Sequence, residues 1–107
     1  MKLIKKGEGV ELSGTSLVGY VTAVYADLVE KIGYPTYTGD KYEKVQAEWL
    51  FQFEDEDGNK FVASLYDWKN YESGVPQGVY EWHVGGNSTR AVEAVANLLG
   101  NVALASR

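Results

Sequence analysis

Cysteine is absent from the 107-residue sequence, and histidine and methionine each occur only once. Without cysteine the chain cannot form disulfides, thiolate nucleophiles, zinc–thiolate sites or iron–sulfur ligands. No apolar run approaches the ~20 residues that cross a bilayer. The basic start MKLIKKGEGV also lacks the apolar core of a secretory signal. We therefore expect a soluble intracellular protein that makes no membrane contact.

Basic residues are also scarce, because ten Lys and Arg against fifteen Asp and Glu give a net charge of −5. Direct nucleic-acid binding and attraction to anionic membranes both depend on clustered basic side chains, so we expect neither. Two interpretations of the acidity stay open. It provides ordinary solubility, or it forms an acidic surface that meets a basic site on a partner protein.

Aromatic residues are abundant, with eight Tyr, three Trp and three Phe. The apolar content of 45% is typical of a globular protein, and the length predicts a single domain over residues 1–107. One small core does not enclose this many rings. We therefore expect some of them at the surface.

Apolar periodicity predicts two helices. The first follows an N-cap at Thr22 and ends at Gly33, and its buried face holds Tyr25, Leu28, Val29 and Ile32. The second follows a cap at Asn87 or Ser88, and its buried face holds Val92, Val95, Ala96 and Leu99.

Alternating apolar residues predict the strands, which cover residues 16–24, 45–53, 61–68 and 79–84. Asp57-Gly58 marks a hairpin turn between the second and third of these strands. Residues 1–12 are expected to form an edge strand or a frayed arm, and residues 101–107 a loose tail.

The predicted order β(β)αβββα gives an α+β two-layer sandwich. Its four- to five-stranded, mainly antiparallel sheet carries two helices on one face. Two helices with one apolar stripe each cover only that face. The opposite face is then a mixed polar and aromatic surface, made of Glu48, Gln52, Val62, Tyr66, Trp68, Glu81 and His83.

The stretch LYDWKNY (65–71) is the strongest candidate for a binding surface. Rigid aromatic rings beside a basic side chain are typical of protein interfaces. The predicted partner-binding residues are Tyr66, Asp67, Trp68, Lys69, Tyr71 and His83. Two alternatives stay open: the rings stack on a base, or they simply cover the sheet edge.

The corner WHVGGNSTR (82–90) is a second candidate, for an anion or small ligand. Free backbone N–H groups at a helix start attract anions. The candidate ligand-binding residues are Trp82, Gly85, Gly86, Asn87, Ser88 and Arg90. The dinucleotide and P-loop glycine patterns are both missing. Because a tight turn into a helix needs the same residues, we favour a structural role for this corner.

Catalysis is the least favoured interpretation. His83 beside Glu81 or Asp67 has the chemistry of a general base, but no nucleophile, metal set or cofactor loop accompanies it. The acidic turn EDEDGNK also departs from the calcium-loop pattern. We therefore expect no enzyme, no cofactor and no metal.

Four stretches carry a resemblance to a known group of proteins: YADLVEKIGYP, AEWLFQF, SLYDWKNY and EWHVGGNSTRAVEAV. Over residues 16–99 their spacing resembles a family of small bacteriophage-encoded accessory proteins, largely without assigned chemistry. Its pattern is YxDLV…GxP…W…[IV]Y[DN]WK…WH[IV]GG, and Leu65 departs from it conservatively.

The resemblance implies a phage protein that acts in the cytoplasm of a bacterial host cell. By analogy, such proteins inhibit host defence. The first hypothesis is a non-enzymatic protein that binds and blocks a host protein. The second is a sponge that sequesters a nucleotide or cyclic nucleotide at the 85–90 corner. Exposed aromatics are also compatible with a homodimer.

Overall fold

The computed structural model describes residues 1–39, 43–70, 74–100 and 103–106. Within these residues the chain forms two helices and seven strands. The strands are β1 (Lys2–Lys6), β2 (Ser16–Val24), β3 (Tyr37–Thr38), β4 (Ala47–Glu54), β5 (Lys60–Tyr66), β6 (Val79–Gly86) and β7 (Ala103–Ser106). The helices are α1 (Tyr25–Ile32) and α2 (Arg90–Leu99).

The strands form one antiparallel sheet in the order β1-β4-β5-β6-β2-β7, and β3 pairs with the first residues of β4. The predicted α+β class is confirmed. The predicted number of strands, four to five, is wrong, because β3 and β7 add to it. β7 lies in the segment expected to be a loose tail, and it pairs with β2 from Gly19 to Thr22.

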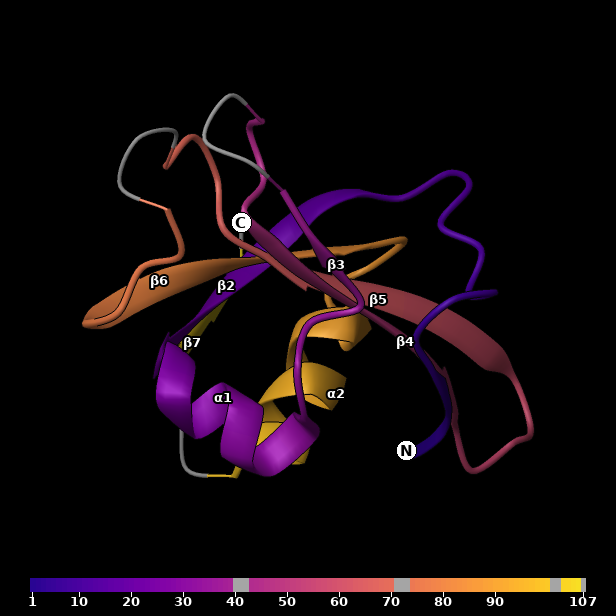
Figure 1. Ribbon diagram of the computed structural model, residues 1–107. Helices are drawn as coiled ribbons and strands as arrows, with labels where there is room; N and C mark the ends of the chain where they lie inside the picture. The colour runs from indigo at the N-terminus through magenta and orange to yellow at the C-terminus, as the bar shows by residue number, and fades with distance from the viewer. Residues whose placement is uncertain (40–42, 71–73, 101–102, 107) are drawn as a thin grey trace.

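Both helices lie on one side of the sheet (Figure 1), and the core is the layer between them. On this side the sheet contributes Trp49, Phe51, Phe53, Leu65, Trp82 and Val84, all buried. The Trp49 and Trp82 rings meet edge to face, with centroids 5.5 Å apart. Their indole N–H groups donate to the carbonyls of Gly33 and Ala23. Both tryptophans are thereby satisfied inside the core.

The connection between β1 and β2, residues 7–15, crosses the opposite side of the sheet; it is called the crossing segment below. β1 and β2 are separated by three strands, a distance of ~19 Å at ordinary strand spacing. Nine extended residues would span about 30 Å, so the segment can cross the sheet and still turn at Gly7–Val10 and at Leu12–Thr15. Figure 1 shows the segment passing over the sheet on the side away from the helices. The segment covers part of that face, where Leu50 is only 4% exposed.

Neither helix in the described part of the chain is long and apolar enough to span a membrane.

Candidate functional site

The sheet face away from the helices, called the outer face, carries a row of side chains that runs across four strands. Glu48 of β4 is the register partner of Tyr66 in β5. Tyr66 is opposite His83 in β6, and His83 is opposite Tyr20 in β2. Side chains at paired positions lie on the same face. The register therefore brings together residues that are 63 positions apart in the sequence.

Four rings of this face contact one another and form what we call the ring row: Tyr20, His83, Tyr66 and Trp68. His83 lies between the two tyrosines, with centroid distances of 5.1 Å to Tyr20 and 5.4 Å to Tyr66. Trp68 meets Tyr66 edge to face at 6.4 Å and is 40% exposed. Trp68 is therefore the ring of this row most available to a partner.

The surroundings of His83 disfavour its charged form. Burial lowers the pKa of His83, and the Glu81 and Asp67 carboxylates offset this only in part. Its Nδ1 atom is buried and has no hydrogen-bond partner among the described residues. The Asp67 carboxylate binds other groups and does not orient the imidazole. Among the described residues, therefore, no carboxylate orients the imidazole of His83 through Nδ1.

A hollow of about 250 Å³ opens on the outer face beside the ring row. We call it the outer hollow. The crossing segment and the start of β2 form one wall, and residues from β4, β5, β6 and the loops beside β4 and β5 form the other. Its lining is Leu12, Thr15, Ser16, Leu17, Val45, Glu48, Ser64, Tyr66, Trp68 and Gly85.

Two polar side chains in the outer hollow lack partners. The Glu48 carboxylate and the Ser64 hydroxyl form no hydrogen bond or ion pair with any residue that the structure describes. Ser64 is only 3% exposed. Burial raises the pKa of Glu48. Ser64 is buried, and buried polar groups in proteins are normally hydrogen-bonded. Glu48 is half-buried, so both side chains can bind water or a ligand in the hollow.

Two lysines flank the exposed indole at the rim of the hollow. The Nζ atoms of Lys44 and Lys69 lie 5.8 and 6.0 Å from the Trp68 ring centroid. The backbone N–H of Lys69 also donates to the Lys44 carbonyl, at 2.6 Å. Lys69 therefore lies beside Trp68, as the sequence predicts.

Asp67 is fully buried, so the prediction that it contacts a partner at the surface is wrong. Its Oδ1 accepts the backbone N–H groups of Gln46 and Ala47, at 2.7 and 3.0 Å. Its Oδ2 accepts the side-chain amide of Asn70 at 3.0 Å. Asp67 therefore ties the end of β5 to the segment before β4 and fixes the backbone that carries Trp68. Tyr71, the remaining predicted contact residue, lies outside the described residues.

The glycines of the predicted ligand corner are strand residues. A Cβ at Gly86 would lie 2.5 Å from the Ala91 Cβ, and a Cβ at Gly85 would lie 2.5 Å from the Ser64 Oγ. Gly86 therefore allows α2 to approach β6, and Gly85 leaves room for Ser64. Trp82 is fully buried, so its ring does not face a ligand at this corner.

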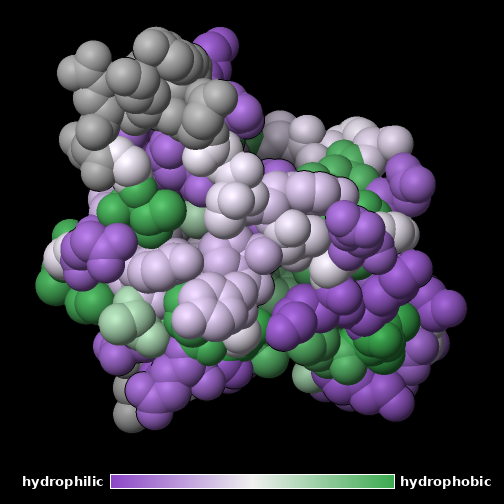
Figure 2. Space-filling view, viewed as in Figure 1, coloured by the Kyte–Doolittle hydropathy of each residue, from purple (hydrophilic) through white to green (hydrophobic). Residues whose placement is uncertain are grey.

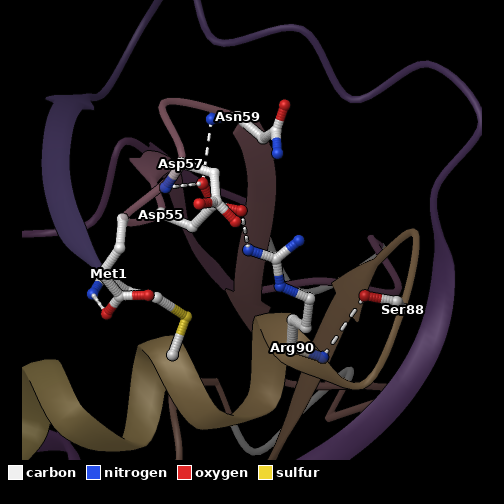
Figure 3. Close-up of polar contacts among 7 residues, drawn as sticks. Met1, Asp55, Asp57, Asn59, Ser88 and Arg90 are labelled. Atoms are coloured by element: carbon white, nitrogen blue, oxygen red, sulfur yellow. Dashed lines mark hydrogen bonds and ion pairs between the residues drawn. The ribbon is translucent and has the colours of Figure 1, made fainter.

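Arg90 at this corner is already engaged. Its guanidinium donates to Asp55 of the acidic turn and lies 4.6 Å from the Phe61 ring centroid. Figure 3 shows the Arg90 side chain reaching from α2 toward that turn, while its backbone N–H donates to the Ser88 hydroxyl. Asn87 and Ser88 are exposed. These contacts favour a structural role for the corner.

The acidic turn that binds Arg90 is closed by its own backbone. Asp55 accepts the N–H groups of Asp57 and Asn59, both at 2.9 Å. The Asn59 N–H, followed by the Arg90 guanidinium, lowers the pKa of Asp55. Figure 2 shows strongly hydrophilic residues gathered over the β4–β5 hairpin and the N-terminal end, while the middle of this view is of intermediate hydropathy.

Sequence reasoning missed the outer hollow. The sequence predicts Glu48 on the outer face but gives it no role, and it singles out neither Ser64 nor Leu12. Alternation in β4 and β5 shows which side chains share a face. No local sequence pattern shows that residues 12–17 form the second wall of the hollow.

No cluster of potential metal ligands occurs among the described residues.

Comparison of the chain with protein-family models, curated proteins and solved structures finds no match.

Proposed function

We propose that this protein is a non-enzymatic binding protein that recognises a partner protein through Trp68 and the outer hollow. The observation that supports this most is the unpaired Glu48 and Ser64 inside a hollow whose rim bears an exposed tryptophan. Tryptophan at the edge of a small pocket is typical of the residues that dominate binding energy. Inhibition of a host protein by covering it, as the phage resemblance implies, is part of the proposal.

A nucleotide sponge at the 85–90 corner finds less support. Gly85, Gly86 and Trp82 are buried there, and Arg90 is paired with Asp55. Few donors are left for a phosphate. A ligand present at ~100 times its Kd adds about 2.7 kcal/mol to the free energy of unfolding. A thermal-shift screen with nucleotides therefore tests this alternative. A clear rise in the unfolding temperature with one nucleotide would support the sponge.

The test of the proposed function is capture from a bacterial lysate on the immobilised protein, compared among three variants. Wild type and Tyr34→Ala should retain the same protein, while Trp68→Ala should lose it. Tyr34 is a matched control because it is an aromatic residue that is 78% exposed and lies just after the Gly33 C-cap of α1, away from the outer hollow. Equal unfolding temperatures for the variants would show that Trp68→Ala leaves the fold intact. Retention by Trp68→Ala would contradict the proposal.

A further inference from the structure

The outer hollow has two polar groups that call for hydrogen-bond donors. The Glu48 carboxylate, when ionised, only accepts hydrogen bonds, and the Ser64 hydroxyl accepts as well as donates. Neither has a partner in the described part of the chain, and Ser64 is 97% removed from solvent. A carboxylate in a partly buried hollow without a cation is complementary to a positively charged donor.

The remaining walls of the hollow suit an aliphatic stem. Leu12, Leu17 and Val45 line it together with the Tyr66 ring. Its volume of about 250 Å³ is below the ~300–1,000 Å³ of ordinary small-molecule pockets. A single long side chain therefore fits this hollow better than a whole cofactor or dinucleotide. Lysine and arginine both place apolar methylenes behind a charged head.

The rim distinguishes between the two basic residues. The Trp68 indole already has the ammonium groups of Lys44 and Lys69 beside it. The positive charge of the partner's side chain is therefore bound by the Glu48 carboxylate. A guanidinium is planar, weakly hydrated and able to bind a carboxylate through two parallel hydrogen bonds. An ammonium is a compact and strongly hydrated charge, which is costlier to bring into a partly buried hollow. The net charge of −5 also favours a basic partner surface.

We propose that the outer hollow accepts an arginine side chain of the partner protein, with its guanidinium bound by Glu48 and Ser64. This inference rests on the proposed function and names the chemistry of the partner's contact. Tyr66 and the aliphatic wall enclose the arginine stem, and Trp68 covers the rim. Gly85 is needed for the same site, because a side chain there would displace the Ser64 hydroxyl from the hollow.

The test is an NMR titration of the ¹⁵N-labelled protein with N-acetyl-arginine-N-methylamide and with the matching citrulline derivative. Citrulline has nearly the same shape but no charge. The arginine probe should shift the Ser64 and Gly85 amides and the Trp68 indole N–H, and citrulline should bind at least tenfold more weakly. Glu48→Gln should weaken arginine binding at least tenfold. Glu81→Gln, which removes an exposed acidic residue of β6, should leave binding unchanged.

Equal binding of citrulline, undiminished binding by Glu48→Gln, or equal loss in Glu81→Gln would each overturn the inference. So would a guanosine monophosphate probe that shifts the same signals at lower concentration than arginine, because the rim lysines would then hold a phosphate. The proposed function is tested separately. Capture that depends on Trp68 without arginine binding refutes only the arginine inference. Arginine binding by a protein that captures nothing from the lysate refutes only the proposed function.

Discussion

Glu48 and His83 are placed in surroundings that disfavour their charged forms. Burial raises the pKa of Glu48 and lowers that of His83. Residues that cost stability without structural compensation are expected mainly at functional sites. Asp67 shows the opposite case, because its buried carboxylate is fully used by backbone N–H groups and Asn70. At the residue scale, unmet hydrogen-bonding capacity separates binding groups from structural ones.

Replacing Glu48 with Gln should stabilise the protein at neutral pH. The pKa of Glu48 is raised above its ordinary value of 4.5 in the folded state. Its contribution to stability is therefore fully present below that value and is lost as pH rises through the folded-state pKa. Urea unfolding should show Glu48→Gln more stable than wild type at pH 7.5, with the difference vanishing below about pH 4. A less stable variant at pH 7.5 would show that the carboxylate serves the fold.

Replacing His83 with Phe tests the unpartnered imidazole. The pKa of His83 is lowered below 6.5, so its contribution to stability is present above pH 6.5 and is lost as pH falls through the folded-state pKa. Wild type should lose more stability than His83→Phe between pH 7.5 and 5. At pH 7.5 the variant should be at least as stable, because Phe leaves no buried nitrogen unpaired. The measurement is urea unfolding of both proteins at pH 7.5 and pH 5. An equal loss of stability in wild type and His83→Phe would contradict this assignment.

At the scale of elements, the sequence predicts the helices well and their beginnings poorly. The predicted apolar face of α2 is buried, and that of α1 is buried at Leu28 and Ile32, whereas Tyr25 and Val29 are only half-buried. The predicted cap at Thr22 is wrong, because β2 continues to Val24 and runs directly into α1. Val24 is extended and forms no side-chain cap. Strand pairing with β6, which no local pattern reveals, decides where that helix begins.

The strands that the sequence missed are short and have weak local signals. β3 has two residues, and it forms because Tyr37 and Thr38 lie beside the start of β4. β7 is the small apolar segment ALAS, whose pairing with β2 depends on the return of the chain after α2. Both depend on contacts with residues distant in sequence. Alternation within a few residues does not encode such contacts.

The contact between α2 and β6 depends on Gly86. A methyl group there would lie 2.5 Å from the Ala91 Cβ, so the helix must shift to accommodate it. Gly86→Ala should lower the free energy of unfolding by about 2 kcal/mol, within the usual range for an overpacked core. Gly78→Ala is the matched control, because nothing lies within 4 Å of its added Cβ. Equal urea midpoints for the two variants would contradict this reading of the interface.

At the scale of the whole molecule, the outer face is the product of two parts that only the complete fold brings together. Strand alternation predicts that Tyr66, Trp68 and His83 share the outer face with Glu48. The register brings Glu48, Tyr66 and His83 together, and the Trp68 ring contacts the Tyr66 ring. It does not predict the crossing segment, which turns a flat sheet face into a hollow. The sequence predicts Asp67 as a partner contact because it flanks Trp68, whereas its carboxylate accepts the backbone N–H groups of Gln46 and Ala47.

The most direct test of the proposed interface is hydrogen–deuterium exchange of the protein alone and in complex with the partner that wild type retains and Trp68→Ala loses. Amides of residues 12–17, of β4 near Glu48 and of residues 64–70 should exchange more slowly in the complex. Amides of α1 and α2 should be unchanged. Protection confined to the helices, with the outer face exchanging as in the free protein, would contradict the assignment of the outer face as the binding surface.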